Sequence, residues 1–489
     1  MKKRLTKGQM IIFSLGQFGW SLLGGIISAW LVTYFLPTEA DVTAGATRYI
    51  VPGLAIGGFL TVIGLITALS RVFDAITDPL IASLSDRSKN KRGRRIPFMQ
   101  VAAIPFAAVT ILLFCIDFGA YDSSLGWINI VWVSVMIVLF YLFMTMYCTP
   151  YNALISEFGQ NQEDRMFIST AISFTYLFGT LVAYLPFVLA SPLRGMGLSY
   201  AWSYRVCFII LAVVACIMML LPTFLLKETD FIDPKPSNEN VLKSLVATFK
   251  NKDFRVFSIS DIMYWVGLTM FQTGLPYFVK VSMGFDESYV IVFMGGMSIL
   301  AAVFYPFVTK FVKKFGKKKL VIAGFLGLAF CYAIAAISSI SGICPKEGEG
   351  ANVISWLFGL AIMIISALPM ALLGIIPQSI VADVAEAEAK TTGENREGMF
   401  FAARTFAMKL GQSVAMILFT SLAVSMSAGS SATEVYPSKG GLIIVAAVAV
   451  LFCVLGAIIL FFYREKRIMQ TIAKEEDKEF LRVLENEKE

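Results

Sequence analysis

The sequence contains about twelve apolar runs, each long enough to cross a lipid bilayer. A transmembrane helix needs roughly 20 mainly apolar residues, and inside lipid only helices or closed barrels satisfy the backbone hydrogen bonds. Of the 489 residues, 57% are hydrophobic and 15% are charged, whereas a soluble domain carries about 25% charged residues. We therefore predict an all-α integral membrane protein with these spans: Met10–Leu36, Val51–Ser85, Pro97–Ile116, Trp127–Ile155, Phe167–Ala190, Val206–Leu226, Val256–Met283, Val290–Val312, Leu320–Ile340, Val353–Val381, Met399–Met426 and Gly441–Phe462.

The distribution of cations predicts the orientation of these spans. Connectors rich in Lys and Arg alternate with connectors that carry almost none, and the basic ones are expected on the cytoplasmic side. The basic segments are 2–7, 87–95, 313–319 and 464–467, so both termini are predicted to be cytoplasmic, in a multi-pass protein of the cell membrane. The formal charge of +7 is spread over these connectors, which indicates topology in a bilayer and no nucleic-acid partner.

Two of the basic connectors resemble each other. The segments "SDRSKNKRGRR" and "VTKFVKKFGKKK" follow the second span in each set of six, and each has a Gly before its last cations. This repeat predicts two like six-helix halves, 1–227 and 253–464, with a cytoplasmic middle loop at 228–252 and a cytoplasmic tail at 465–489. Two like halves around a site near the bilayer midplane are typical of secondary transporters.

The residue types limit the chemistry that is available. The chain has no His and seven Cys without a CxxC pair, which argues against His-based metal sites and against Ser-His or Cys-His catalysis. No phosphate-binding loop is present either. We therefore expect neither an enzyme nor a bound cofactor, and no metal beyond a possible Na⁺.

A stripe of charges lies in the second apolar run. Arg71, Asp74 and Asp78 are spaced i, i+3, i+7 and so project from one face of a helix. Each ionised group near the bilayer centre costs about 2.5–3.5 kcal/mol, so the stripe should face a water-filled cavity or partner groups. Arg71 neutralises one carboxylate, and the remaining negative charge suits a monovalent cation, Na⁺ or H⁺, with Thr77 as a neutral oxygen nearby. The alternative is an ion-pair network that only holds helices together.

Polar residues on two later spans are candidates for the same site. Thr145, Thr149 and Asn152 lie at i, i+4, i+7, although hydroxyls in membrane helices often bond only their own backbone. Lys409 lies too deep in its span to reach the interface and should pair with the aspartates. Asp261 is expected to be an interfacial charge near a cytoplasmic helix end.

Three segments together resemble a known family. "RVFDAITDPLIASLSDRS", "YCTPYNALISEF" and "ADVAEAEAKTTGENREGMFFAARTFAMKLG" are similar to the glycoside–pentoside–hexuronide:cation symporters, the melibiose-carrier-like branch of the major facilitator superfamily. The resemblance extends over nearly the whole chain. It implies secondary active symport of a sugar or sugar-like solute with Na⁺ or H⁺ by alternating access. It also implies that Asp74 and Asp78 bind the coupling cation, that Thr145 is a neutral ligand, and that Lys409 lies nearby.

The sugar-binding side departs from the family pattern. Ser21 and Cys148 stand where the family has carboxylates, and Ser173 or a neighbour stands where it has an arginine. Charged groups that would hold sugar hydroxyls in bidentate fashion are therefore missing. A cation-coupled carrier of lysophospholipids or other amphipathic lipids, from the same superfamily, remains the alternative. A non-transporting receptor or an intramembrane enzyme is a third.

Two further groups of residues complete the predicted site. The residues expected to line the substrate cavity are Trp20, Ser21, Cys148, Thr149, Tyr151, Asn152, Trp265 and Trp356. The residues expected to act in gating are Arg92, Arg94, Arg95, Arg396 and Glu397. The basic members could pair with carboxylates across the two halves in one state and release them in the other; simple anchoring by the positive-inside rule is the competing interpretation.

Overall fold

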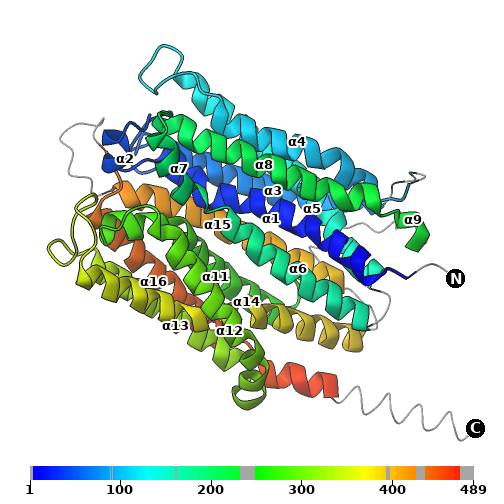
Figure 1. Cartoon of the computed structure of the whole chain (residues 1–489). Coiled ribbons are helices and arrows are strands. Elements are labelled where there is room, and N and C mark those ends of the chain that lie inside the picture. The colour runs from blue at the N-terminus through cyan, green and yellow to red at the C-terminus, as the bar shows by residue number, and fades with distance from the viewer. Residues whose placement is uncertain are drawn as a thin grey trace, which may run out of the picture.

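The computed structural model of the chain describes residues 4–86, 88, 90, 92–159, 162–231, 248–392, 397–425 and 435–473. Its long helices lie side by side in one elongated bundle (Figure 1). In chain order the elements are α1 (Lys7–Phe35), α2 (Glu39–Thr43), α3 (Val62–Asp86), α4 (Ile96–Cys115), α5 (Trp127–Phe158), α6 (Gln162–Val182), α7 (Pro186–Gly195), α8 (Tyr200–Leu225), α9 (Glu228–Phe231), α11 (Lys252–Tyr277), the π-helix η1 (Phe278–Ser282), α12 (Tyr289–Phe315), α13 (Lys317–Ser338), α14 (Val353–Thr392), α15 (Glu397–Val424) and α16 (Lys439–Phe461).

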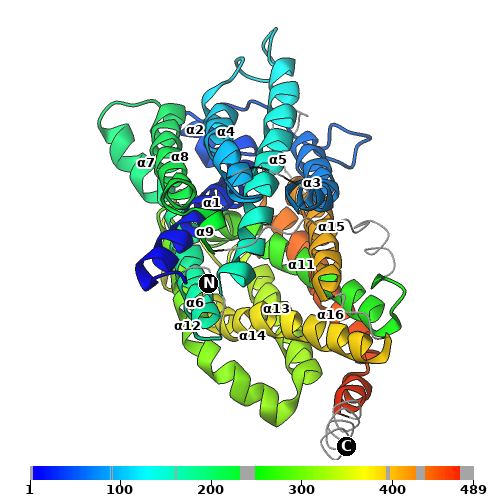
Figure 2. The same cartoon turned by 90° about the vertical axis from the view of Figure 1, so that its right-hand side faces the viewer.

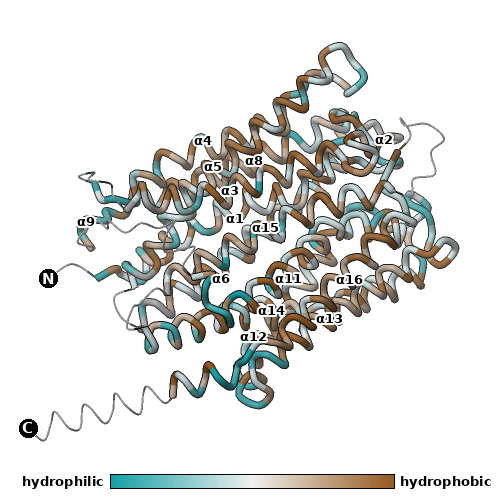
Figure 3. Tube along the Cα trace, turned by 180° about the vertical axis from the view of Figure 1, so that it is seen from behind, coloured by the Kyte–Doolittle hydropathy of each residue, from teal (hydrophilic) through white to brown (hydrophobic). Residues whose placement is uncertain are grey.

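The described helices fit a membrane-spanning bundle. Ten spans among the described residues are long and apolar enough to cross a bilayer. Helices α3 and α11, of 25 and 26 residues, are less apolar but pack among them, which completes the predicted twelve. Residues along the middle of the bundle are mainly hydrophobic, and hydrophilic residues gather at its two ends (Figure 3).

The two ends of the bundle are distinct. The start of α1, the short helix α9 and the end of α16 lie at one end, which we call the cytoplasmic end; α2 and α7 lie at the other, which we call the outer end (Figure 1). The basic connector around Arg94 and Arg95 and the lysines that begin α13 also belong to the cytoplasmic end, because they follow α3 and α12. This arrangement agrees with the orientation expected from the cations.

The second span begins later than the sequence predicts. Helix α3 starts at Val62, whereas the apolar run starts at Val51. Gly53, Gly57 and Gly58 have φ angles of 73°, 62° and 76°, in the left-handed region that glycine adopts without strain. These glycines turn the chain at the outer end instead of continuing the helix.

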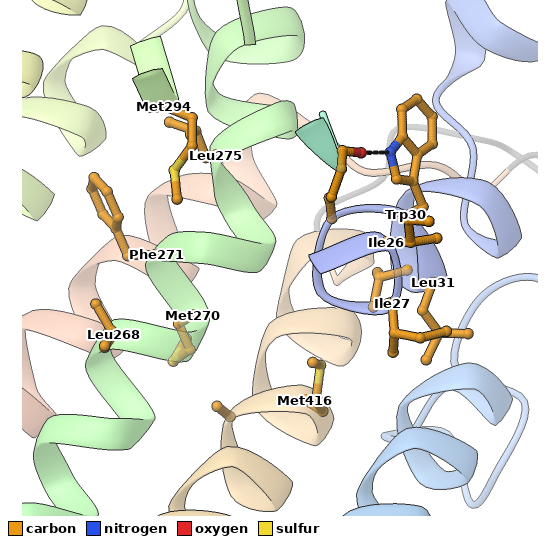
Figure 4. Packing of buried hydrophobic residues seen from close by; sticks show 14 of the residues in the cluster. Ile26, Ile27, Trp30, Leu31, Leu268, Met270, Phe271, Leu275, Met294 and Met416 are labelled. Atoms are coloured by element: carbon orange, nitrogen blue, oxygen red, sulfur yellow. Dashed lines mark hydrogen bonds between the residues drawn. The ribbon is translucent and has the colours of Figure 1, made fainter. Parts of the chain in front are cut away.

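The fifth predicted span is broken into two helices. Helix α6 ends at Val182 and α7 begins at Pro186, because proline has no N–H to continue the helical hydrogen bonds. The break exposes the carbonyl of Ala183, which accepts a hydrogen bond of 3.0 Å from the indole Nε1 of Trp30 on α1 (Figure 4). The Trp30 ring stacks on Phe187 of α7 at a centroid distance of 3.9 Å, so one buried side chain stabilises the break.

The two halves of the chain show the same packing pattern. In the first half the main contacts are α1–α6, α1–α8, α3–α5, α4–α5 and α4–α8; in the second they are α11–α15, α11–α16, α12–α14, α13–α14 and α13–α16. Replacing each helix by its equivalent in the other half converts one set into the other. Viewed end-on, the first-half helices α3, α4, α5 and α8 lie on one side and α12, α13, α14 and α16 on the other (Figure 2). The internal repeat expected from the basic connectors thus has a structural counterpart, while the domain bounds themselves remain a prediction.

The contacts between the halves are asymmetric. Helix α3 packs along α15 over an extensive surface, whereas the equivalent pair α6 and α12 meets only lightly. Three polar contacts follow the α3–α15 seam from the outer end inward. Thr61 Oγ1 lies 2.7 Å from Thr420 Oγ1, Ser413 donates to the carbonyl of Ala68 at 2.9 Å, and Lys409 reaches the aspartates of α3.

Close packing inside the first half leads to a stability prediction. A Cβ added at Gly19 of α1 would lie 2.5 Å from the carbonyl oxygen of Ala215 on α8, whereas a Cβ at Gly24 of the same helix meets nothing within 4 Å. We expect Gly19→Ala to force the helices apart and cost about 1–3 kcal/mol of unfolding free energy. Gly24→Ala should be neutral or stabilising by up to about 1 kcal/mol, since alanine favours a helix. Thermal unfolding of the two purified variants measures the difference, and equal midpoints would contradict this packing.

Candidate functional site: a charged cluster between the two halves

The charged stripe of α3 faces α15. Asp74 is fully buried, and the side chain of Asp78 is 26% exposed. The ammonium Nζ of Lys409 lies 2.8 Å from Asp74 Oδ1 and 2.6 Å from Asp78 Oδ2. It also lies 3.3 Å from the main-chain oxygen of Asp74. A single cation from the second half is therefore coordinated by two carboxylates from the first half.

Thr145 of α5 completes the oxygen shell around the carboxylates. Its Oγ1 lies 2.9 Å from Asp74 Oδ1 and 2.9 Å from Asp78 Oδ1. A hydroxyl carries one proton, so it can donate to only one of these oxygens at a time. The second close oxygen contact is favourable when a cation lies between the groups, and Lys409 supplies that charge here.

Arg71 lies on the other side of Asp74. Its Nη1 is 3.8 Å from Asp74 Oδ2, and its guanidinium stacks over the ring of Tyr141 at 4.5 Å. Cation–π contact of this kind stabilises a desolvated guanidinium by about 2 kcal/mol. The sequence suggested a surplus negative charge on this stripe. Since Lys409 joins the cluster, two carboxylates face two cations and the surplus is already neutralised.

The remaining cation ligand expected from the sequence points elsewhere. The hydroxyl of Thr77 donates to the main-chain oxygen of Asp74 at 3.1 Å, the local bond that hydroxyls in helices often form. No described contact joins it to the carboxylates. Cys148 of α5, by contrast, lies within electrostatic range of Asp74, Asp78 and Lys409, next to the cluster.

Five of the residues expected to line the substrate cavity are not fully buried. Trp20, Cys148, Thr149 and Trp265 are partly buried, and Asn152 is exposed, although it belongs to a helix of the bundle interior. Trp20 packs against Tyr176 of α6 at a centroid distance of 6.3 Å. The structure therefore leaves these five as candidates.

Three other cavity candidates are corrected by the structure. Ser21 is buried against α6, where a Cβ on Gly179 would lie 2.2 Å from its hydroxyl oxygen. Tyr151 is fully buried within the first half, stacks on Phe13 at 4.4 Å and donates to the Phe13 carbonyl. Trp356 lies at the outer end of α14 among Phe285, Tyr289 and Phe293. Each of these side chains packs between helices, as aromatic and small polar residues in a helix bundle more often do.

The basic gating candidates pair inside their own half. Arg94 and Arg95 contact Glu157 of α5, the latter at 2.9 Å. Their main-chain N–H groups donate to the carboxylate of Glu228 on α9 at 3.0 Å and 2.8 Å. The expected pairing across the halves is therefore not made in this conformation. Arg92 is exposed; Arg396 and the side chain of Glu397 lie outside the described residues.

One buried ion pair was misplaced by the sequence reasoning. Asp261 on α11 was expected at an interface, but its side chain is 1% exposed. Arg404 of α15 binds it in bidentate fashion, with Nε 3.0 Å from Oδ2 and Nη2 3.3 Å from Oδ1. The spacing of Arg404 and Lys409 on one helix was the available signal, because two cations deep in a span both require buried carboxylates.

A network at the outer end joins the two halves. Lys280 of η1 lies 2.6 Å from Asp41 of α2 and 3.6 Å from Glu347. The hydroxyl of Thr38 lies 2.8 Å from the carboxylates of both Asp41 and Glu347. The side chains of Lys280 and Asp41 are only 7% and 9% exposed. Sequence reasoning missed this network, although a lysine inside the 256–283 apolar run was a visible sign of a buried partner.

A second group of contacts closes the same end. Glu287, between η1 and α12, accepts contacts from Arg194 of α7 and from the hydroxyl of Tyr204 on α8. The hydroxyl of Tyr277 donates to the carbonyl of Leu36 at 2.8 Å. At the cytoplasmic end, each ion pair between described residues joins partners from one half. The halves are thus tied together at the outer end and along α3–α15.

The outer acids respond to burial in different ways. Burial opposes ionisation of Asp41, but Lys280 and Thr38 outweigh it and hold its pKa below 3.8. Burial raises the pKa of Glu287 above 4.5 and outweighs Lys280, Tyr204 and Arg194. Burial also raises the pKa of Glu347 above 4.5. The closed outer end therefore binds protons on these glutamates more readily than an open, solvated end would.

Comparison with known proteins identifies the family. The profile of the family described as "MFS/sugar transport protein" matches residues 12–466, so the chain belongs to this family and is a multi-pass membrane transporter, not an enzyme. Similar relatives include the uncharacterized symporter YjmB of Bacillus subtilis (strain 168), 27% identical over 85% of this chain and 83% of that protein. YagG of Escherichia coli (strain K12), provisionally named a glycoside/cation symporter, is 24% identical over 81% of each chain. The isoprimeverose transporter of Lactiplantibacillus pentosus is 21% identical over 66% of this chain and 63% of that protein.

Solved structures show the same fold at lower sequence identity. The crystal structure of a D-xylose-proton symporter has 13% sequence identity and a TM-score of 0.62, and the match covers 94% of this chain and 98% of that chain. This similarity concerns the helix arrangement alone. The twelve-helix major facilitator fold expected from the sequence is confirmed.

The outer network leads to a prediction about conformation. Asp41→Asn removes the nearest carboxylate of the buried Lys280 and leaves it with Glu347 at 3.6 Å and the more distant Glu287, which should cost the closed outer end up to about 3–5 kcal/mol. The double variant Asp41→Asn/Lys280→Gln should recover most of the closure, because it removes the buried ammonium together with its nearest carboxylate, and Glu347 keeps its contact with the hydroxyl of Thr38. Spin labels on introduced cysteines at the exposed positions 59 and 353, which lie at the outer ends of different halves, would report the separation. An unchanged distance distribution in the single variant would show that the contact does not hold the halves together.

The same acids predict how pH affects closure. Since Glu287 and Glu347 have raised pKa values in the closed form, their contribution to closure is full below 4.5 and is lost as pH rises through the raised values. Asp41 acts in the opposite sense, but only as pH falls below 3.8. The spin-label distance should therefore shift toward the closed form on acidification from neutral pH to about 4.5. Glu287→Gln with Glu347→Gln should flatten this dependence, and a parent chain that opens on acidification would contradict it.

Proposed function

We propose that the chain is a cation-coupled symporter of a sugar or sugar-like solute, and that the coupling cation, Na⁺ or H⁺, binds between Asp74, Asp78 and Thr145. The observation that carries this proposal is the position of the Lys409 ammonium, which lies between the two carboxylates. An oxygen cage that holds one buried ammonium has the charge needed to hold another monovalent cation. The family description and the names of the relatives support a sugar and a cation as partners.

Lys409 acts in this proposal as an internal competitor of the coupling ion. The cluster is neutral while Lys409 is in place, so an entering Na⁺ must displace the ammonium to keep the carboxylates paired with one cation each. Protonation of Asp78, the more exposed carboxyl, would weaken the lysine's hold in the same way. Either ion thus produces the same result, a Lys409 side chain released from α3.

Release of Lys409 also provides the link to transport. Lys409 belongs to the second half and its partners to the first, so the ion pair is one of the ties along the α3–α15 seam. A cation that breaks this tie lowers the cost of moving the halves against each other. Alternating access then depends on two contacts between the halves, the α3–α15 cluster and the outer network, which have different electrostatic requirements.

The competition model predicts opposite effects for two kinds of variant. Asp74→Asn and Asp78→Asn should each abolish a saturable Na⁺ or Li⁺ shift in the thermal unfolding midpoint, or, for H⁺ coupling, a pH-dependent shift. Lys409→Gln should instead raise the cation affinity by about tenfold or more, equivalent to about 1.4 kcal/mol, because it removes the competing ammonium. Titrations of purified protein with Na⁺ and Li⁺ at several pH values measure both effects.

The matched control is Lys317→Gln. Lys317 forms an ion pair of 2.6 Å with Asp383 at the cytoplasmic end of the second half. The Lys317→Gln variant therefore measures how the removal of any paired lysine affects the unfolding midpoint and the cation affinity. It should leave the cation affinity unchanged. If none of the aspartate variants changes the response to any ion, the cluster is only a structural ion-pair network and the proposed cation site fails.

Competition between solutes distinguishes sugar transport from the alternative, the transport of amphipathic lipids. Transport in proteoliposomes with an imposed Na⁺ or H⁺ gradient should be inhibited by neutral glycosides and not by lysophosphatidylcholine below its micellar concentration. The reverse result would favour the carrier of amphipathic lipids.

A further inference from the structure

A second charged group lies in the interior of the bundle, away from the cation cluster. The Asp261–Arg404 pair joins α11 and α15 within the second half, and the two side chains are 1% and 11% exposed. Arg404 lies on the same helix as Lys409 and closer to its cytoplasmic start. Neither member takes part in the contacts that tie the halves together, so the pair has no role in the mechanism above.

A series of neighbouring aromatic side chains leads from this pair to the first half. Tyr264 is within electrostatic range of Asp261, Arg404, Tyr305 and Tyr176. It packs against Trp265 at a centroid distance of 5.2 Å, and Tyr176 packs against Trp20 at 6.3 Å. Rings on four helices, α1, α6, α11 and α12, are therefore linked through Tyr264 to the ion pair.

Two of these tyrosines lie on helices that meet only lightly across the halves. Tyr176 of α6 and Tyr305 of α12 are 50% and 46% exposed, and these helices belong to the lightly packed α6–α12 contact. The corresponding α3–α15 side is closed by its polar seam.

Several buried polar atoms on α1, α11 and α15 lack a hydrogen-bond partner among the described residues. These are the indole Nε1 of Trp20, the hydroxyl of Thr269 and the amide oxygen Oε1 of Gln412. Thr269 follows Asp261 and Trp265 at i, i+4, i+8 along α11. Gln412 follows Gly411, whose added Cβ would lie 3.0 Å from the Trp265 Cβ. An unsatisfied buried donor or acceptor costs about 1–3 kcal/mol, and a hydroxyl-rich ligand would remove that cost.

The chemistry of the group indicates the class of ligand. A carboxylate paired with a guanidinium carries no net charge, yet it offers acceptors and donors at once for adjacent hydroxyls. Aromatic faces cover the apolar C–H face of a ring. At two first-half positions where the resembling family has charged groups, Ser21 is buried against α6 and the hydroxyl of Ser173 donates to the carbonyl of Ser169.

We infer that the Asp261–Arg404 pair, with Gln412 and the rings of Trp20 and Trp265, holds the hydroxyls of a neutral glycoside, and that the second half therefore supplies the polar part of the substrate site. The inference rests on the proposed sugar symport. It assigns substrate selectivity to α11 and α15 and leaves cation binding to α3 and α5. The two sites share α15 through Arg404 and Lys409, so a cation that releases Lys409 acts on a helix that also carries a substrate ligand.

The test measures substrate and cation separately. Labelled isoprimeverose and lactose serve as neutral probes and glucuronate as an anionic one, in proteoliposomes with an imposed Na⁺ or H⁺ gradient. Asp261→Asn should raise the KM for the transported glycoside by about tenfold or more, the loss expected for hydrogen bonds to a charged group. The cation affinity measured by thermal shift should change by less than about threefold.

Two further variants test whether a raised KM results from misfolding. The double variant Asp261→Asn/Arg404→Gln leaves no unpaired buried charge and should fold, yet it should show the same KM defect. Asp383→Asn, which breaks the comparable Lys317–Asp383 pair at the cytoplasmic end of the second half, should leave the KM unchanged.

The possible outcomes are distinct. A raised KM in both Asp261 variants with normal cation binding supports the inference. If the parent transports a glycoside and the variants lose only thermal stability, as Asp383→Asn would, then the pair is structural and the inference fails while the proposed function stands. Transport of glucuronate alone also overturns it, because a pair without net charge should select neutral solutes. A parent that transports none of these sugars under either gradient refutes the proposed function, and the inference with it.

Discussion

The ammonium of Lys409 between Asp74 and Asp78 is the interaction on which the rest of the structure depends. Each of these groups would be costly alone inside a bilayer, and together with Arg71 they form a neutral cluster. Because the lysine comes from one half and the carboxylates from the other, satisfying the charges also brings the halves together. A cation that competes for the carboxylates therefore acts on the contact between the halves directly, without a separate transmitting element.

The asymmetry of the two halves has a functional consequence. Both repeat the same helix packing, yet only α3–α15 forms an extensive contact across the halves, while α6–α12 meets lightly. The tight side contains the charged cluster and a polar seam; the loose side leaves Tyr176 and Tyr305 half exposed. An internal repeat thus yields two different contacts between the halves, a tight one with buried charges and a light one with exposed tyrosines.

The stripe on α3 and its pairing with Lys409 were accessible from the sequence because helical spacing and the cost of buried charge are local and general rules. Asp261 was misjudged, since its depth depends on where α11 sits in the bundle. Ser21, Tyr151 and Trp356 were misplaced because the rotation of a helix about its axis decides which residues face its neighbours. The pairing of Asp41 with Lys280, separated by 239 positions, leaves no local pattern at all.

The sequence by itself determined the membrane-spanning architecture, its orientation, its internal repeat and the need to neutralise the charges on α3. Those properties follow because lipid requires each apolar segment to satisfy its own backbone as a helix. Only the tertiary structure decided which cation meets which carboxylate, that the outer end is tied across the halves, and that the basic cytoplasmic residues pair within one half. Such choices depend on how each helix is rotated and packed against its neighbours. Polar and small side chains make the contacts that decide this, each contact contributes little energy, and the partners lie far apart in the sequence.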